Sequence, residues 1–175
     1  MSNLRLINET LVTSDVSFVN ITDLFSSDYD VYQITFSEVD TDTTAYIYMR
    51  LINTAGSVIT SSNYDYGYSL PDSTVGAATS NNTGQTSFLN INYFSNVLAE
   101  SGVNTITLFN PYSTSSYTYM MNEGAGFFSS RMNAIKYIGL FDTLDSIGGV
   151  QFSVAGNSSY NISKAKIRTY GLRVD

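Results

Sequence analysis

The stretch Val31-Tyr32-Gln33-Ile34-Thr35-Phe36-Ser37 alternates, from Tyr32 onward, between apolar and polar side chains. Successive side chains of an extended chain point to opposite faces, so this alternation predicts a strand with one buried side. The run from Thr44 to Ile52 repeats the pattern, with an apolar side chain at every second position. Between the two runs lies Asp40-Thr41-Asp42-Thr43, whose side chains favour a turn. This region is therefore predicted to be two strands joined by a turn.

The same alternation recurs along the rest of the chain. Further strands are predicted at Val103 to Asn110, Ser116 to Met121, Val150 to Val154 and Lys164 to Val174. In the second of these runs, Tyr117, Tyr119 and Met121 share one side. In the last run the apolar side moves from odd to even positions from Tyr170 onward. Such a change needs one extra residue, and Gly171 is predicted to accommodate it as a β-bulge.

Helix signals are few. The run from Tyr93 to Ser101 follows Asn92 as a cap and is followed by Gly102, so it predicts at most one short helix. Residues 71–86 contain few large apolar side chains and are predicted to form a long loop. The sequence thus favours an all-β, two-sheet antiparallel sandwich, with a jelly roll ahead of other Greek-key folds.

The composition excludes most catalytic chemistry. The chain contains neither cysteine nor histidine. Serine and cysteine nucleophiles activated by histidine, and the common zinc sites, therefore cannot be built. No glycine-rich phosphate loop occurs either. These observations predict a protein that is not an enzyme, with no catalytic residue, no metal site and no cofactor.

Paired carboxylates remain possible as a source of chemistry. Asp28 and Asp30 lie in a Ser-Ser-Asp-Tyr-Asp segment typical of a turn, where aspartate is expected without any catalytic role. Glu38, Asp40 and Asp42 cluster at a second turn, and clustered oxygens suit calcium. Their spacing is not that of a known calcium loop, so a solvated turn is the favoured interpretation.

Charge is unevenly distributed along the chain. Residues 1–72 carry ten acids against Arg5 and Arg50, a net of −8, whereas residues 131–175 carry six bases against three acids, a net of +3. This is either charge scattered over loops or a pair of complementary faces that meet between copies. The total of −7 argues against nucleic acid as the main partner. No run approaches the roughly 20 apolar residues that cross a bilayer, so no membrane partner is expected.

Two sets of side chains are candidates for partner contact: Tyr64, Tyr66 and Tyr68, and Lys164, Lys166 and Arg168. Tyrosines at alternate positions either stack on sugars or a protein partner, or pack into the core. The basic stripe either meets acids of another copy or lies on a solvated edge strand, where lysines block unwanted pairing.

Two long stretches, Phe25 to Val39 and Asp42 to Leu51, resemble small β-rich virion proteins from tailed phages of marine and freshwater bacteria. In that group the first stretch enters a strand through Ser-Tyr-Asp-Tyr, and the second is a strand of the type Ala-x-Leu-x-Met/Leu-Arg. Later motifs of the group match, in the same order, at Tyr64 to Tyr68, Leu108 to Pro111, Ala134 to Ile138 and Ile167 to Leu172. The resemblance covers most of the chain from about residue 18 onward.

The resemblance implies a jelly-roll virion structural protein on the exterior of the particle, made in the host cytoplasm. An outer-capsid decoration or cement protein that stabilises the shell is favoured, because the chain is short and lacks a stalk. The alternative is a tail-fibre or tail-tip module that contacts host glycans. Expected partners are the major capsid protein, other virion proteins and further copies of the chain, with a trimer favoured. Residues 1–175 are expected to form one domain, with residues 1–17 as an extended docking arm.

Overall fold

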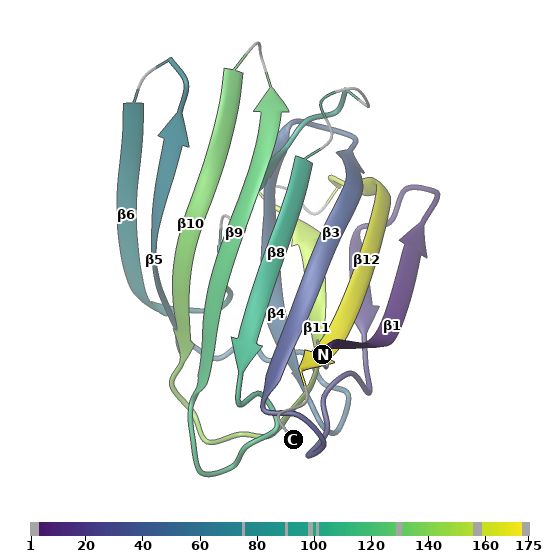
Figure 1. Cartoon of the computed structure of the whole chain (residues 1–175), viewed down its shortest axis with the longest axis vertical. Helices are drawn as coiled ribbons and strands as arrows, with labels where there is room; N and C mark the ends of the chain where they lie inside the picture. Colours follow the sequence, from purple (N-terminus) through teal and green to yellow (C-terminus); the bar gives the residue numbers. More distant parts are fainter. Residues whose placement is uncertain are drawn as a thin grey trace.

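The computed structural model describes residues 4–74, 76–89, 91–97, 100, 102–128, 131–155 and 159–172 (Figure 1). The regular secondary structure of this part of the chain is almost entirely β-strand. The strands are β1 (Leu4–Val12), β2 (Phe18–Ile21), β3 (Val31–Thr41), β4 (Ala45–Asn53), β5 (Tyr64–Asp72), β6 (Gly76–Gln85), β7 (Tyr93–Phe94), β8 (Gly102–Phe109), β9 (Thr118–Phe128), β10 (Arg131–Phe141), β11 (Ile147–Val154) and β12 (Ile162–Leu172).

The strands form two antiparallel sheets packed face to face. The large sheet has eight strands in the order β1-β12-β3-β8-β9-β10-β5-β6, and the small sheet has four in the order β2-β11-β4-β7. The sets β1-β12-β3-β8 and β2-β11-β4-β7 are the two sheets of a jelly roll, in which the chain passes repeatedly from one sheet to the other. The prediction of an all-β, two-sheet antiparallel sandwich with a jelly-roll order is confirmed.

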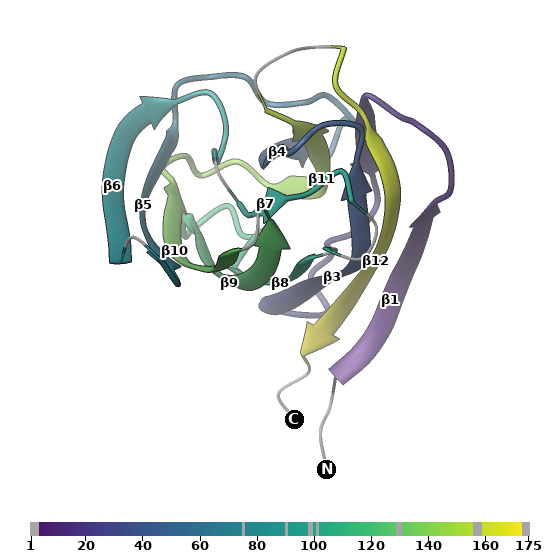
Figure 2. The same ribbon diagram turned by 90° about the horizontal axis from the view of Figure 1, so that it is seen from above.

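Two hairpins enlarge one sheet of this jelly roll. The β5–β6 hairpin lies between β4 and β7 in the sequence, and the β9–β10 hairpin lies between β8 and β11. The β9–β10 hairpin adds next to β8, and the β5–β6 hairpin adds next to β10. The large sheet therefore extends beyond the small sheet on that side. Seen from above, the large sheet curves around the small one (Figure 2). The hairpins leave the large sheet with a wide outer face.

The space between the sheets is filled by one apolar core. Phe36 on β3 and Phe152 on β11 meet edge to face across it, with ring centroids 4.7 Å apart. Tyr64 on β5 packs in the same way on Phe88, with centroids 4.9 Å apart. Each large apolar side chain removed from water contributes about 1.5–3 kcal/mol, so the core is the main source of stability.

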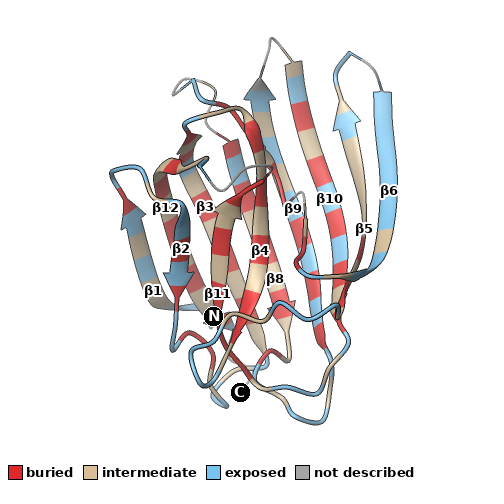
Figure 3. Ribbon diagram, turned by 180° about the vertical axis from the view of Figure 1, so that it is seen from behind, coloured by how far each residue is buried: buried red, intermediate tan, exposed pale blue. Residues whose placement is uncertain are grey.

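Two predicted elements are wrong. Tyr93 and Phe94 form β7 rather than the start of a helix, because they pair with Tyr46 and Ala45 at the edge of β4. Residues 71–86 are not a loop, since they contain the end of β5 and all of β6. Strand β6 is exposed along almost its whole length (Figure 3). Its residues cover no core, so they need no alternation of apolar side chains, which is why the sequence resembled a loop.

The predicted bulge at Gly171 is also wrong. Strand β12 pairs with β3 without a register shift from Lys166 to Leu172. The alternation continues unchanged, so Gly171 points inward and Leu172 points outward. A Cβ at position 171 would lie 2.6 Å from the Tyr29 ring, which explains the glycine. The apolar even positions near the end of β12 therefore indicate an apolar outer face rather than an extra residue.

The described part of the predicted docking arm is built into the sheet. Leu4–Val12 forms β1, which pairs with β12 along the edge of the large sheet. Val16 continues this contact through a bridge to Ile162. Docking of residues 1–17 on a capsid or a neighbour stays a prediction, and residues 1–3 lie outside the described residues.

Candidate functional site

The three candidate tyrosines of β5 point toward the core. Tyr64 and Tyr66 are buried, and Tyr68 is half-buried. The Tyr64 hydroxyl donates to the carbonyl oxygen of Ile59 at 2.9 Å and accepts from the Leu51 N–H at 3.0 Å. Tyr64 and Tyr66 are therefore core residues, and the prediction that their rings contact a partner is wrong, because a partner could not reach them.

Three tyrosines fill the space under the part of the large sheet that extends past the small one. Tyr66, Tyr68 and Tyr137 stack with ring centroids 5.3–6.2 Å apart. Burial raises the pKa of Tyr66 to about 12 and raises the pKa of Tyr137 well above its usual range. The small sheet has only four strands and does not reach this part of the large sheet. The stacked tyrosine rings cover the inner face there instead, which is a structural role.

The burial of Tyr64 predicts alkaline unfolding. Burial raises the pKa of Tyr64 from 10.0 to about 12, so above pH 10 the unfolded chain loses a proton that the folded chain retains. Stability from this group is fully present below pH 10 and decreases as the pH rises to 12, by about 2–3 kcal/mol. Denaturant unfolding across this pH range should show at least this loss for the native chain, because burial raises the pKa of Tyr66 and Tyr137 in the same direction. Tyr64→Phe should be about 1–3 kcal/mol less stable at neutral pH, with a shallower alkaline decline. Tyr117→Phe, an exposed control, should change neither quantity.

The candidate basic stripe meets acids of its own chain. Lys164 and Lys166 approach Glu38 at 2.9 and 3.9 Å, and Arg168 contacts Glu9 at 2.6 Å. The hydrogen bond and charge of Lys164 lower the pKa of the Glu38 carboxyl below its usual range. Strand β12 lies between β1 and β3, so the edge-strand interpretation is wrong. Contact of this stripe with another copy stays a prediction.

A different surface stands out on the outer face of the large sheet. The register places apolar side chains opposite one another on neighbouring strands β10, β9, β8, β3, β12 and β1, in one continuous row: Leu140, Tyr119, Phe109, Val31, Leu172 and Leu4. The adjacent row contains Ile138, Met121, Thr107, Gln33, Tyr170 and Leu6. We call these two rows the apolar belt.

Several belt side chains are exposed to solvent. The exposed fractions are 61% for Ile138, 51% for Leu6, 48% for Tyr119, 45% for Met121 and 42% for Leu4. The outer face of the small sheet mixes the polar side chains of Asn20, Gln151 and Ser153 with the Phe18 ring, which is about half exposed. Contiguous apolar patches of this kind mark interaction sites on soluble proteins. The belt is therefore the candidate functional site.

A charged row borders the belt. Its outer-face members, one on each of the same strands, are Lys136, Glu123, Thr105, Thr35, Arg168 and Glu9. Lys136 pairs with Glu123 at 3.4 Å, as Arg168 does with Glu9 at the opposite side of the sheet. An apolar centre with a charged border is the usual anatomy of a protein interface.

One end of the belt is hollowed. A depression of about 720 Å³ lies over β9, β10 and the β5–β6 hairpin, lined by apolar side chains of β8, β9 and β10 and by polar residues of the hairpin. Tyr119, Met121 and Ile138 contribute to the lining, and Gly67 opposite Ile138 adds no side chain to fill it. Asp65 lies at the rim, where its carboxylate accepts the Gly84 N–H at 2.7 Å.

Sequence reasoning missed the belt because both faces of its strands carry apolar side chains. In β9, Met120 is buried whereas Tyr119 and Met121 are exposed, so the aromatic side singled out from the sequence is the outer one. In β10, Ile135 and Tyr137 are buried while Ile138 is exposed. A strand that is apolar at both odd and even positions was the available signal.

The acidic turn does not form a metal-type cluster. Glu38 is engaged by Lys164, and Asp42 accepts a hydrogen bond from Asn161 at 2.9 Å. Within the described ranges, no three His, Cys, Asp or Glu side chains lie together as metal ligands would. The same part of the chain contains no helix long and apolar enough to span a membrane.

Comparisons with known proteins find only distant likenesses. No family model and no curated protein matches the chain. Among solved structures, a legume lectin-like domain from Entamoeba histolytica is similar over 94% of this chain and 90% of its own, with 10% identity and a TM-score of 0.34. A structure from work on endo-acting O-glycanases of human gut microbiota matches 88% of this chain and 59% of its own, with 11% identity and a TM-score of 0.22.

Proposed function

We propose that this protein is a non-catalytic structural subunit of a tailed-phage particle, an outer-capsid decoration or cement protein that stabilises the shell. The observation that supports this proposal is the apolar belt. It lies on the outer face of hydrogen-bonded strands, so it is a preformed surface that needs little ordering on binding. Its partners on the particle exterior are the major capsid protein, other virion proteins or further copies of the chain.

Covering the belt with protein supplies the driving force. Removing apolar surface from water contributes about 25 cal/mol per Å², and Ile138, Leu6 and Tyr119 are each about half exposed or more in the single chain. A protein that binds the assembled shell but not its free subunits stabilises the shell by mass action.

Copy number in purified particles tests this proposal. We expect quantitative mass spectrometry of gradient-purified phage to find the chain at an abundance comparable to that of the major capsid protein. Particles lacking the chain should take up the purified protein and gain heat resistance. Ile138→Asp should abolish this uptake, because a charge would lie in the buried belt. Phe18→Asp, an equally apolar substitution site outside the belt, should bind normally. Absence of the chain from particles contradicts the proposal.

The hollow favours a second candidate function, a tail-fibre or tail-tip module that contacts host glycans. Sugars stack on exposed aromatic rings while polar groups bind their hydroxyls. The hollow offers the Tyr119 ring beside Asp65, Asn81 and Thr83. On this alternative, the isolated protein binds defined glycans on an array, Tyr119→Ala removes the binding, and the copy number matches that of tail proteins.

A further inference from the structure

We infer that the apolar belt is covered by a second copy of the same chain, in a two-fold dimer whose axis runs parallel to the strands between β3 and β8. This inference deepens the proposed function by naming the partner of its surface, and it rests on that function only for its role in the particle. The two copies would pack the outer faces of their large sheets against each other, as aligned sheets do at about 10 Å.

A two-fold axis in this position fixes which strands oppose one another. The six belt strands run in the order β10, β9, β8, β3, β12 and β1, with the axis in the middle. Rotation about the axis reverses this order in the second copy and leaves each row at the same height. Strand β10 then faces β1 of the second copy, β9 faces β12, and β8 faces β3. The same patch serves both copies, as a two-fold interface requires.

The apolar rows are self-complementary under this rotation. In the first row, Leu140 faces Leu4 of the second copy, and Phe109 faces Val31. In the second row, the same rule sets Ile138 against Leu6 and Met121 against Tyr170, while the polar pair Thr107 and Gln33 meets at the axis. No apolar side chain of the belt is placed opposite a charge.

The bordering charged row provides a stricter test, because charges have a sign. Lys136 on β10 faces Glu9 on β1 of the second copy, and Glu123 on β9 faces Arg168 on β12. Thr105 faces Thr35 at the axis. The Lys136–Glu123 pair of one copy thus faces the Glu9–Arg168 pair of the second copy, with each charge opposite one of the other sign. The two-fold axis repeats this group of four charges on its other side. Had the signs on β12 and β1 been exchanged, like charges would have met across the interface.

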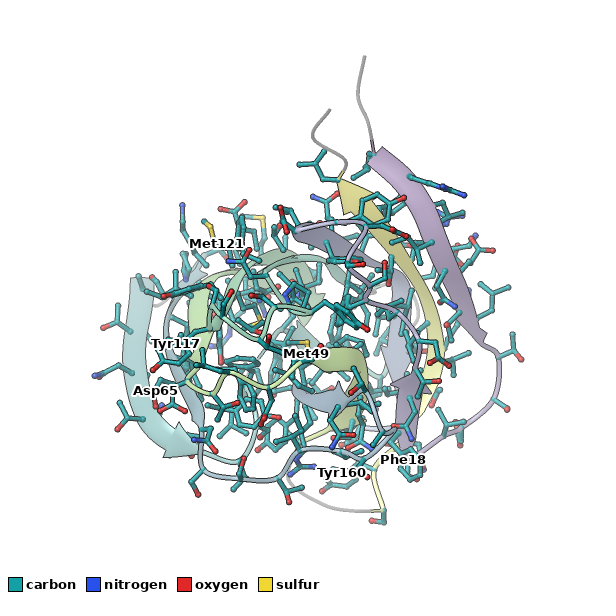
Figure 4. All side chains as sticks on the ribbon, turned by 90° about the horizontal axis from the view of Figure 1, so that it is seen from below. Phe18, Met49, Asp65, Tyr117, Met121 and Tyr160 are labelled. Atoms are coloured by element: carbon teal, nitrogen blue, oxygen red, sulfur yellow. The ribbon has the colours of Figure 1, made fainter. Side chains whose placement is uncertain are left out.

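The shape of the face agrees with this pairing. Views from above and below both show the ends of β12 and β1 near the chain termini standing out beyond β8 and β9, on the side where Met121 lies (Figures 2 and 4). The hollow lies at the β10 end of the belt, away from β12 and β1, over β9, β10 and the β5–β6 hairpin. The two-fold rotation brings the projecting Leu4 and Leu6 of one copy to the hollow of the other.

Charge reversal with mixing tests the inference. Lys136→Glu places glutamate against Glu9 twice in a homodimer, and Glu9→Lys places lysine against Lys136 twice. Each variant alone should dimerise about tenfold more weakly than the native chain. A mixture of the two should form heterodimers, since each of its interfaces pairs opposite charges at both sites. Sedimentation velocity measures both quantities, and thermal melting confirms that each variant is folded.

Cross-linking gives a second measurement that does not depend on the charged side chains. The chain has no cysteine, so introduced thiols report only the designed contact. A mixture of Gln33→Cys and Thr107→Cys chains should be joined by a bifunctional thiol cross-linker that spans about 10 Å, because facing backbones of packed sheets are too far apart for a direct disulfide. Gln151→Cys, on the outer face of the small sheet, should not cross-link with either.

The outcomes separate this inference from the proposed function. A native chain that stays monomeric at high concentration, or a trimer that the charge variants leave unchanged, overturns the dimer even if the protein still binds particles. A dimer with the expected mixing behaviour that is absent from purified particles upholds the inference and overturns the proposed function. Variants that fail to associate after mixing also overturn the two-fold arrangement.

Discussion

Phe152→Ala is expected to lower the free energy of unfolding by about 3–5 kcal/mol. Phe152 is fully buried on β11 and meets the Phe36 ring of β3 edge to face at 4.7 Å. This contact joins the small sheet to the large one at the centre of the jelly roll. Truncation removes the transfer free energy of the ring and leaves a cavity between two sheets whose backbones are fixed by hydrogen bonds, so the site can collapse only partly.

Denaturant unfolding measures this loss, and a neighbouring phenylalanine provides the control. Phe18 lies on β2, opposite Ser153 of β11, but its side chain points to solvent and is about half exposed. Phe18→Ala should therefore change the free energy of unfolding by less than about 0.5 kcal/mol. Equal losses for the two variants would contradict the placement of Phe152 between the sheets.

Where one side of a strand is clearly polar, the sequence was sufficient. The alternation of β3 and β4 predicted both strands and their buried faces, since Ile34, Ile47 and Met49 all lie in the core. The turn between these strands was equally readable, because aspartate and threonine favour turns for local reasons. The two-sheet architecture follows from several such strands that each need a partner for one apolar face.

The errors arose where this assumption of a polar outer face fails. Leu172 was interpreted as evidence for a bulge because an apolar side chain was expected to point inward, whereas it lies on the belt. The prediction for β6 was wrong for the opposite reason. Neither face of this strand is buried, so its sequence shows no alternation of apolar and polar side chains. The belt is created by the pairing of six strands, several of which are distant in the sequence, and the pattern of one strand does not show which distant strand will be its neighbour.

The dependence on strand pairing also explains why the candidate contact residues predicted from the sequence differ from those of the belt. Tyrosines at alternate positions, such as Tyr64 and Tyr66, are typical of a surface that binds a partner. Here the large sheet curves around the small one, and these side chains lie on its inner face, in the core. The basic residues of β12 were isolated in the sequence, yet Glu9 and Glu38 reach them from the neighbouring strands. Of these basic residues, the inferred interface includes only Arg168, because the strand register places it in the charged row that borders the belt.

Met121→Asp is expected to dissociate the inferred dimer without unfolding the chain. Met121 lies in the belt between Thr107 and Ile138, and its side chain is nearly half exposed in the single copy. An aspartate at this position costs little while it is solvated. In the dimer it would be buried against Tyr170 of the second copy without a cationic partner, and an unpaired charge in such a place is strongly unfavourable.

Symmetry doubles this effect, because each dimer contains the substitution twice. A loss of about 2 kcal/mol at each site raises the dissociation constant about a thousandfold, as measured by sedimentation equilibrium. Met121→Leu conserves the apolar volume and should dimerise like the native chain. The melting temperature at low concentration, where all chains are single, should be the same for the three proteins. If Met121→Asp instead lowered that temperature while leaving association intact, the side chain would belong to the core of one chain and not to a surface shared by two.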